Sequence, residues 1–281
     1  GGNRVSLFKP NDPAVLSRKG NLIWVSRIKQ ALEQNRFCLF SQPIHPIAFK
    51  TSDMPFFHYE TLLRLFDNEG NPIPPDNFLP AAEEQGMMLD IDKWVVHEAF
   101  RNLKLIKQTS PLPVFSINLS GQSVNEAAFL DFILDEIKTM DVNPQMICFE
   151  LTESVAVDSL DTAMQFMKTL KALGCSFSLD DFGTGVSSYA YLRQLPINYL
   201  KIDGVFIKDI VTDEVSQEMV RSIKQIGHVM GLEIIAEYVE NDEIIEILNE
   251  IGIDYGQGYG ISRPVPIDEV VATHQQIEAV V

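Results

Sequence analysis

Cysteine is scarce in this chain of 281 residues. There are three, Cys38, Cys148 and Cys175, and they lie within apolar, strand-like runs without the paired spacing of a zinc or thiol redox site. An odd number also cannot form a complete disulfide framework. We therefore expect three buried, reduced thiols.

Positive charge is also in short supply. The sequence holds 22 lysine and arginine residues against 39 aspartate and glutamate residues, which gives a net charge of −17 at pH 7. No basic stripe offsets this excess, so binding to DNA, to an RNA polymer or to an anionic membrane surface is disfavoured. A substrate that carries phosphate would need cations to mediate its binding.

Long apolar runs are missing as well. No stretch approaches the roughly 18 to 20 apolar residues that span a bilayer, and the N-terminus has no signal-peptide pattern. We expect a cytoplasmic location and no membrane contact for the residues given, although a longer parent protein could be anchored through another segment.

The sequence does contain enough apolar residues for one large core, since 46% of the chain is hydrophobic and 22% is charged. Residues 1–20 lack apolar periodicity and indicate an irregular lead-in. Residues 21–36 have apolar side chains at helical spacing and predict a linker helix. Residues 37–281 then form the main domain.

Eight short apolar runs in the main domain predict β-strands. They are residues 37–43, 57–65, 114–119, 146–151, 176–181, 199–203, 233–239 and 254–261. Helical patterns lie between most of them, at residues 91–106, 124–140, 160–173, 215–230 and 243–251. Strands and helices that alternate over this length predict a closed (β/α)8 barrel with a largely parallel sheet.

The first connection breaks this alternation. Residues 44–56 contain Pro46 and Pro55 but no helical period, so no helix is expected between the first two strands. Strands without a helical crossover between them are expected to pair antiparallel. The predicted fold is therefore a modified α/β barrel of the TIM type in which the first strand runs against the others.

Polar and apolar residues alternate along the predicted strands. Glu150, for example, lies on the face opposite Phe149 and Leu151. In a barrel the apolar face packs against the helices, so the polar face points toward the axis. The same alternation directs the following side chains inward: Glu60, Arg64, Ser116, Asn118, Ser120, Cys148, Thr152, Ser178, Asp180, Lys201, Asp203, Glu237, Gln257 and Tyr259.

Two adjacent carboxylates, Asp180 and Asp181, end one of these strands just before a glycine-containing turn. Alone, such a pair is more typical of a turn with a helix cap. Burying unpaired carboxylates costs several kcal/mol each, and Lys201 and Arg64 cannot neutralise all the acids that converge here. They are Glu60, Glu150, Asp180, Asp181, Asp203 and Glu237.

Hard divalent cations offset such repulsion, because Mg²⁺ and Mn²⁺ prefer oxygen ligands. We therefore predict a site for one or, more consistently with the number of acids, two such ions. Zinc is not expected, since the five histidines show no ligand spacing. A set of salt bridges and helix caps at the rim of the barrel is the structural alternative.

Seven short motifs follow one another along the chain. They are Tyr59-Glu60-Thr61-Leu62-Leu63-Arg64, Ile117-Asn118-Leu119-Ser120, Phe149-Glu150-Leu151-Thr152-Glu153, Asp180-Asp181-Phe182-Gly183-Thr184-Gly185, Leu200-Lys201-Ile202-Asp203, Ala236-Glu237-Tyr238-Val239-Glu240 and Gln257-Gly258-Tyr259. Together, in this order, they resemble the EAL-domain cyclic di-GMP phosphodiesterases. The resemblance covers roughly residues 28–281 and implies a modified (β/α)8 barrel with its first strand reversed.

The residues before this region carry a second, shorter resemblance. The segment from Asn3 to Arg27 resembles the closing part of a GGDEF-type cyclase domain followed by a linker helix. This implies a longer parent protein with an upstream GGDEF or sensor domain. A simple flexible N-terminal tail is the alternative.

The main resemblance implies hydrolysis of one phosphodiester bond of cyclic di-GMP to linear pGpG, with water activated by two Mg²⁺ or Mn²⁺ ions. By position, one ion is held by Glu60, Asn118, Glu150 and Asp180. Asp180 would bridge to the second ion, to which Asp181 and Glu237 contribute. Lys201 would hold and help to deprotonate the attacking water, and it forms the implied catalytic set with Glu60, Asp180 and Asp181.

The resemblance also implies positions for substrate binding and regulation. The substrate-binding residues are Gln42, Arg64, Asp203 and Gln257. Glu153 corresponds to the acid that fixes the loop after Asp181, which extends to about Ser188. In the family this loop couples metal binding to dimer contacts, so the resemblance implies a homodimer.

Two positions depart from the family pattern. Thr61 stands where the family signature has alanine, and strand alternation points it away from Glu60, toward the helices. Gly260-Ile261-Ser262 stands where many relatives carry an aromatic residue before the serine, which can alter substrate contacts.

Two other functions stay open. One is a catalytically silent barrel that binds cyclic di-GMP as a receptor, although such relatives usually lose several metal-site acids and none is lost here. The other is a different metal-dependent barrel enzyme that acts on a small carboxylate or sugar, because barrels host many chemistries.

Overall fold

A computed structural model of the chain describes residues 13–49, 57–67, 69–106, 111–183 and 189–277. Of the predicted GGDEF-like segment, residues 1–12 lie outside this described part. Within it, no helix is long and apolar enough to cross a lipid bilayer.

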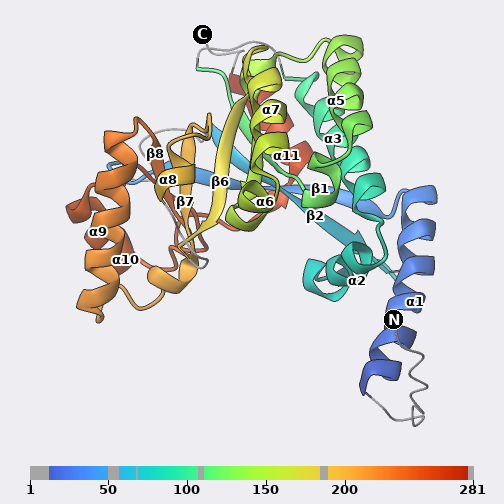
Figure 1. Cartoon of the computed structure of the whole chain (residues 1–281), viewed down its shortest axis with the longest axis horizontal. Coiled ribbons are helices and arrows are strands. Elements are labelled where there is room, and N and C mark those ends of the chain that lie inside the picture. The colour runs from blue at the N-terminus through green and yellow to red at the C-terminus, as the bar shows by residue number, and fades with distance from the viewer. Residues whose placement is uncertain (1–12, 50–56, 68, 107–110, 184–188, 278–281) are drawn as a thin grey trace.

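Eight strands of one sheet close into a barrel (Figure 1). They are β1 (Phe37–Pro46), β2 (His58–Phe66), β4 (Val114–Asn118), β5 (Ile147–Thr152), β6 (Ser176–Phe182), β7 (Tyr199–Ile202), β8 (Glu233–Ala236) and β9 (Tyr255–Gly256). β1 pairs with both β2 and β9, which closes the barrel. The short strands β3 (Pro72–Ile73) and β10 (Val265–Pro266) extend β2 and β1.

The reversed first strand is confirmed. β1 runs antiparallel to β2 and β9, whereas the pairs from β2 through β4 and on to β9 are all parallel. Every parallel strand therefore ends at the same rim of the barrel. This rim receives Asn118, Thr152 and Phe182, the last residues of β4, β5 and β6.

The helices surround the barrel and match the predicted helical patterns with shifts at their ends. The longer ones are α3 (Met88–Leu103), α5 (Ala127–Met140), α7 (Leu160–Lys171), α9 (Glu214–Val229), α10 (Asp242–Ile251) and α11 (Ile267–Ile277). Shorter ones are α2 (Leu79–Glu84), α4 (Gly121–Val124), α6 (Glu153–Asp158), α8 (Tyr189–Leu192), η1 (Pro75–Asn77), η2 (Pro144–Met146) and η3 (Gly204–Phe206).

Two predicted helix boundaries are wrong. The helix predicted over 124–140 is divided into α4 and α5, because the chain turns at Asn125 and Glu126, where Glu126 has an extended backbone. The N-terminal helix α1 (Pro13–Glu33) begins within the stretch predicted to be irregular. Proline is favoured at the first helical position, and a helix can extend without an apolar face.

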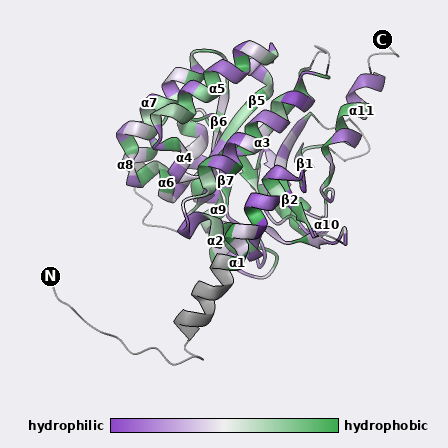
Figure 2. Cartoon of the chain, turned by 90° about the vertical axis from the view of Figure 1, so that its right-hand side faces the viewer, coloured by the Kyte–Doolittle hydropathy of each residue, from purple (hydrophilic) through white to green (hydrophobic). Residues whose placement is uncertain are grey.

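The apolar core lies between the strands and the helices, as the alternation predicts. Phe149 and Phe177 are fully buried, and both rings contact Phe166 of α7 at centroid distances of 6.4 and 6.3 Å. Figure 2 shows hydrophobic residues gathered on the inner strands and polar residues on the outer faces of the helices. Burying each such side chain stabilises the fold by about 1.5–3 kcal/mol. The apolar faces of the strands therefore pack against the helices, and the polar faces point toward the axis.

The second half of α1 belongs to this core. Ile28 and Ala31 are fully buried, and the ring of Trp24 lies 6.3 Å from that of Phe78.

Candidate active site

A buried lysine stands among carboxylates at the rim where the parallel strands end. Lys201 of β7 is fully buried. Its Nζ lies 2.8 Å from Glu237 Oε1, 3.1 Å from Glu150 Oε2, 3.3 Å from Asp180 Oδ1 and 3.5 Å from Glu60 Oε2. Side chains from five strands or strand ends thus meet at one ammonium group, as strand alternation predicts.

Glu60 of β2 is fixed by two amide donors. Asn118 Nδ2 donates a hydrogen bond of 2.6 Å to Glu60 Oε1, and Gln257 Nε2 donates one of 2.5 Å to Oε2. Gln257 Nε2 also lies 3.3 Å from Gln42 Oε1, and Gln42 Nε2 donates to the carbonyl of Ser262. β2, β4 and the segment after β9 are therefore joined through one carboxylate, and β1 is joined to them through Gln257.

The carboxylates of this cluster carry more negative charge than one lysine can neutralise, which shifts their pKa values. Burial raises the pKa of Glu150 to about 8 and that of Glu237 to about 7. Burial also acts to raise the pKa of Glu60, but Lys201 and the amide donors lower it overall. For Lys201, burial opposes the charge, yet the surrounding carboxylates raise its pKa well above the ordinary value. Lys201 is therefore an ammonium hydrogen-bond donor.

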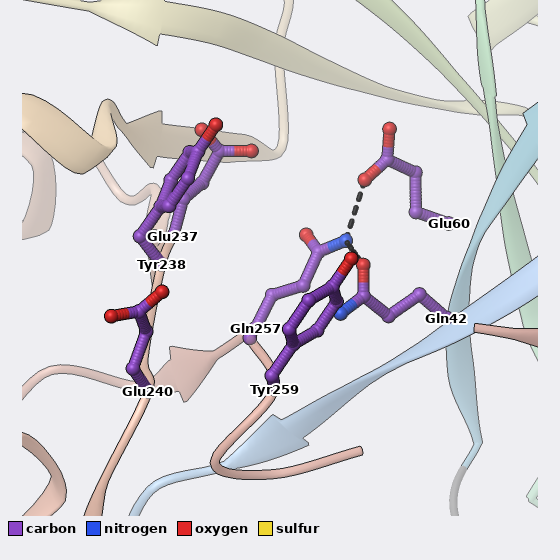
Figure 3. A pocket seen from close by; sticks show the side chains of 8 residues that line it. Gln42, Glu60, Glu237, Tyr238, Glu240, Gln257 and Tyr259 are labelled. Carbon is purple, nitrogen blue, oxygen red and sulfur yellow. Dashed lines mark hydrogen bonds between the residues drawn. The ribbon is translucent and has the colours of Figure 1, made fainter. Parts of the chain in front are cut away.

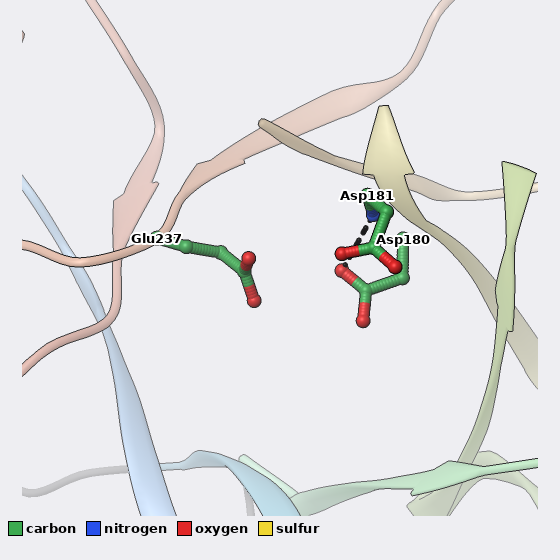
Figure 4. Close-up of side chains that lie close together, drawn as sticks. All are labelled: Asp180, Asp181 and Glu237. Atoms are coloured by element: carbon green, nitrogen blue, oxygen red, sulfur yellow. Dashed lines mark hydrogen bonds between the residues drawn. The ribbon is translucent and has the colours of Figure 1, made fainter. Parts of the chain in front are cut away.

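Three carboxylates form a second, more open group (Figure 4). Asp180, Asp181 and Glu237 each place an oxygen within 4.8 Å of the others. Adjacent residues of a regular strand point to opposite faces, but Asp181 has a left-handed backbone with φ 57° and its N–H donates to Asp180 Oδ1. Burial and the neighbouring charges of Asp180 and Asp203 raise the pKa of Asp181 to about 6.

These residues fit a hard divalent cation. The group of Asp180, Asp181 and Glu237 offers only oxygen atoms, which suits Mg²⁺ or Mn²⁺ rather than zinc. Glu150 Oε1 is buried and accepts no hydrogen bond within the described residues. An unpartnered carboxylate oxygen in such a place is a free ligand atom for a cation.

Glu153 anchors the start of the loop that follows β6. It is the first residue of α6 and is buried. Its carboxylate accepts hydrogen bonds from the Gly183 N–H at 3.1 Å and from the Tyr191 hydroxyl at 2.5 Å. The predicted regulatory loop continues through residues 184–188, which lie outside the described residues.

The other predicted site residues lie in different surroundings. Asp203 caps η3 by accepting a hydrogen bond from the Val205 N–H, and it faces Asp181. Arg64 is half-buried, donates to the Leu63 carbonyl and forms no ion pair within the described part of the chain. Its guanidinium carbon lies 5.8 Å from the centre of the Phe40 ring.

A cavity of about 280 Å³ opens beside the cluster (Figure 3). It is lined by Gln42, Glu60, Glu237, Tyr238, Glu240, Gln257, Gly258 and Tyr259. Sequence reasoning assigned no role to Tyr238 or Glu240, since alternation from Glu237 would turn Tyr238 away from the axis. Tyr238 has a left-handed backbone with φ 54°, which breaks this alternation and which no pattern in the sequence signals.

Comparison with known proteins gives one consistent family. A model described as the EAL domain matches residues 25–264. The chain is 39% identical over 267 residues to cyclic di-GMP phosphodiesterase PdeB of Shewanella oneidensis, covering 95% of this chain and 31% of PdeB. It is 36% identical over 262 residues to cyclic di-GMP phosphodiesterase PdeF of Escherichia coli, covering 93% and 34%. The chain therefore spans about a third of the length of these curated relatives.

Solved structures of related proteins have the same fold as this chain. The PaMucR phosphodiesterase in complex with c-di-GMP superimposes with a TM-score of 0.81 at 32% identity, covering 88% of this chain and 99% of that one. The FimX EAL domain of Pseudomonas aeruginosa bound to c-di-GMP superimposes with a TM-score of 0.77 at 28% identity, covering 86% and 96%.

Proposed function

The chain belongs to the EAL domain family, and we propose that it hydrolyses one phosphodiester bond of cyclic di-GMP to give linear pGpG. The observation that carries the proposal is the set of contacts around Lys201, whose Nζ lies within 3.5 Å of Glu237, Glu150, Asp180 and Glu60. Relatives that are named cyclic di-GMP phosphodiesterases support it.

The donor set supports two divalent cations, Mg²⁺ or Mn²⁺. Glu60, Asn118, Glu150 and Asp180 would hold one, and Asp180, Asp181 and Glu237 would hold the other. When bound, such ions supply a water of lowered pKa and positive charge against the phosphate oxygens. The negative charge of the carboxylates exceeds the single positive charge of Lys201, and bound cations would neutralise the remainder.

Lys201 has the position and the charge to orient the attacking water. Its pKa is raised well above the ordinary value, so Nζ donates hydrogen bonds and holds its proton. A water held by Nζ would lie among the carboxylates that Lys201 contacts. We propose orientation as its role in this state, because removal of a proton from water would require the pKa of Lys201 to fall.

Substrate contacts would come from the amide and charged groups beside the cluster. Gln42 and Gln257 line the cavity and are linked to each other and to Glu60, so they would place the substrate relative to the carboxylates. Arg64 offers a positive charge on β2, and Asp203 adjoins Asp181. Glu153 would keep the strand end in place through Gly183.

We also infer the oligomeric state and the partner domains from the family resemblance. We propose a homodimer, which light scattering with and without cyclic di-GMP would test. We also propose an upstream GGDEF or sensor domain in a longer parent. MucR of Pseudomonas aeruginosa, 32% identical over 247 residues, is named a bifunctional diguanylate cyclase and cyclic di-GMP phosphodiesterase, which supports this arrangement.

Incubation with cyclic di-GMP and Mg²⁺ or Mn²⁺, followed by chromatography, tests the activity. The expected product is pGpG, formed with either ion and absent when EDTA is added. Cyclic di-GMP that is bound but recovered intact would instead support a receptor. Turnover of a small carboxylate or sugar in a substrate panel, without turnover of cyclic di-GMP, would support a different barrel enzyme.

A further inference from the structure

Tyr238 holds a backbone conformation that a bulky residue rarely adopts. It follows Glu237 at the end of β8 and has φ 54°, in the left-handed region that favours glycine. Such strain persists only where the surrounding structure fixes it, and it is concentrated at functional sites. The result here is that Glu237 and Tyr238, which are neighbours in sequence, both line the same cavity.

The ring of Tyr238 is supported from the turn that follows β7. It packs so closely on Gly204 that a Cβ at residue 204 would overlap ring atom Cδ2. Lys208 Nζ lies 4.0 Å from the ring centroid, which is a cation–π distance. Both contacts come from the segment 204–208, so this segment holds the ring in place.

The remainder of the ring is available to a ligand. Tyr238 is 49% exposed although it is held by these two contacts. Figure 3 shows Glu237, Tyr238 and Glu240 along one side of the cavity, with Gln42 and Glu60 across from them. The exposed part of the ring therefore belongs to the cavity beside the carboxylate cluster.

The chemistry of the cavity suits a neutral base with N–H donors. Glu240, which is not among the proposed cation ligands, lines it, and its described lining includes no lysine or arginine. Gln257 is 4% exposed, and its Oε1 has no hydrogen-bond partner among the described residues. Guanine presents N–H donors and a flat ring. The volume, about 280 Å³, is below the range of about 300–1,000 Å³ usual for drug-sized ligands, which suits one base.

We propose that Tyr238 is a substrate-binding residue whose exposed ring face stacks on one guanine base of cyclic di-GMP, with Gly204 and Lys208 supporting the ring from the turn after β7. This rests on the proposed function for the identity of the substrate. Stacking of a base on an aromatic side chain acts on substrate affinity, whereas Glu237 and Lys201 act at the phosphodiester.

Steady-state kinetics of Tyr238→Gly and Tyr238→Phe test the role. Glycine adopts φ 54° without strain, so Tyr238→Gly should fold, which circular dichroism and thermal unfolding would verify. We expect its KM for cyclic di-GMP to rise about tenfold with kcat within about twofold of the wild type. Tyr238→Phe keeps the ring and should rescue KM. Lys168→Met, an exposed position on α7, is the surface control.

Each other outcome overturns the role. An unchanged KM in Tyr238→Gly would rule out stacking. If KM rose in Tyr238→Phe as much as in Tyr238→Gly, the effect would belong to the hydroxyl group and not to the ring. A fall in kcat with unchanged KM would make Tyr238 a positioning residue for Glu237. If the wild type does not hydrolyse cyclic di-GMP, the proposed function fails separately. The Kd of the intact nucleotide, measured by calorimetry, then replaces KM in the same comparison.

Discussion

Replacing Lys201 by methionine removes the ammonium group that faces Glu60, Glu150, Asp180 and Glu237 while it keeps an unbranched side chain of similar length. Breaking a buried ion pair by removing one partner costs about 3–5 kcal/mol. Glu150, whose pKa is already raised to about 8, can take up a proton and limit this loss. We therefore expect the lower end, about 3 kcal/mol, which corresponds to a fall in Tm of about 6–12 °C for a domain of this size.

Thermal unfolding of Lys201→Met in EDTA and in Mg²⁺ measures this cost. In EDTA the variant should unfold below the wild type by the stated interval. In Mg²⁺ the difference should shrink, because cations at the carboxylates replace part of the missing positive charge. Hydrolysis of cyclic di-GMP should fall about a hundredfold or more, since loss of one preorganised hydrogen-bond donor from an active site costs about 10²–10³-fold in kcat.

A matched control separates the loss of the ammonium group in the buried cluster from the loss of an ammonium group at the surface. Lys168→Met removes an ammonium from the exposed face of α7 and should change neither Tm nor turnover. Equal Tm values for Lys201→Met and the wild type in EDTA would show that the carboxylates do not depend on Lys201. Full turnover in the variant would refute the role of Lys201 in the reaction.

Three further changes test other parts of the site and the fold. Glu153→Gln weakens the two hydrogen bonds that anchor the loop after β6, so kcat should fall about tenfold with unchanged circular dichroism; full kcat would argue against anchoring. Burial lowers the pKa of His274, which bonds the Tyr59 hydroxyl, so the unfolded chain binds protons more readily and stability should fall as pH decreases below about 6.5. Urea unfolding from pH 8 to 5 should show a flatter pH dependence in His274→Gln, and equal slopes would count against this. Thr61 Oγ1 is buried without a hydrogen-bond partner in the described structure, so Thr61→Val should stabilise the fold by about 1 kcal/mol with unchanged hydrolysis; lost turnover would place Thr61 in the site.

Much of the barrel and of the carboxylate cluster could be predicted because both depend on simple periodicities. Alternating strands and helices predict the barrel, and a helix-free first connection predicts the reversed β1. Residue alternation brings Glu60, Glu150 and Asp180 to Lys201, since parallel strands end at one rim. None of this requires knowledge of a particular side-chain contact.

The features that the sequence did not predict depend on local backbone geometry. Asp181 and Tyr238 have left-handed backbones, so alternation does not say where their side chains lie. The packing of the Tyr238 ring on Gly204 and the hydrogen bond from Tyr191 to Glu153 join segments that are distant along the chain. Contacts of this kind follow from the closed fold rather than from any repeating pattern.

Hydrolysis of cyclic di-GMP by the wild type and by Glu60→Ala, measured in parallel over a series of Mg²⁺ concentrations, shows whether the carboxylate cluster supports metal-dependent catalysis. Glu60 contacts Lys201, Asn118 and Gln257, so its loss removes a proposed cation ligand from the centre of the cluster. We expect Mg²⁺-dependent formation of pGpG by the wild type and almost none by Glu60→Ala. Formation of pGpG at the wild-type rate by the variant, or by the wild type in EDTA, would refute metal-dependent hydrolysis at this cluster.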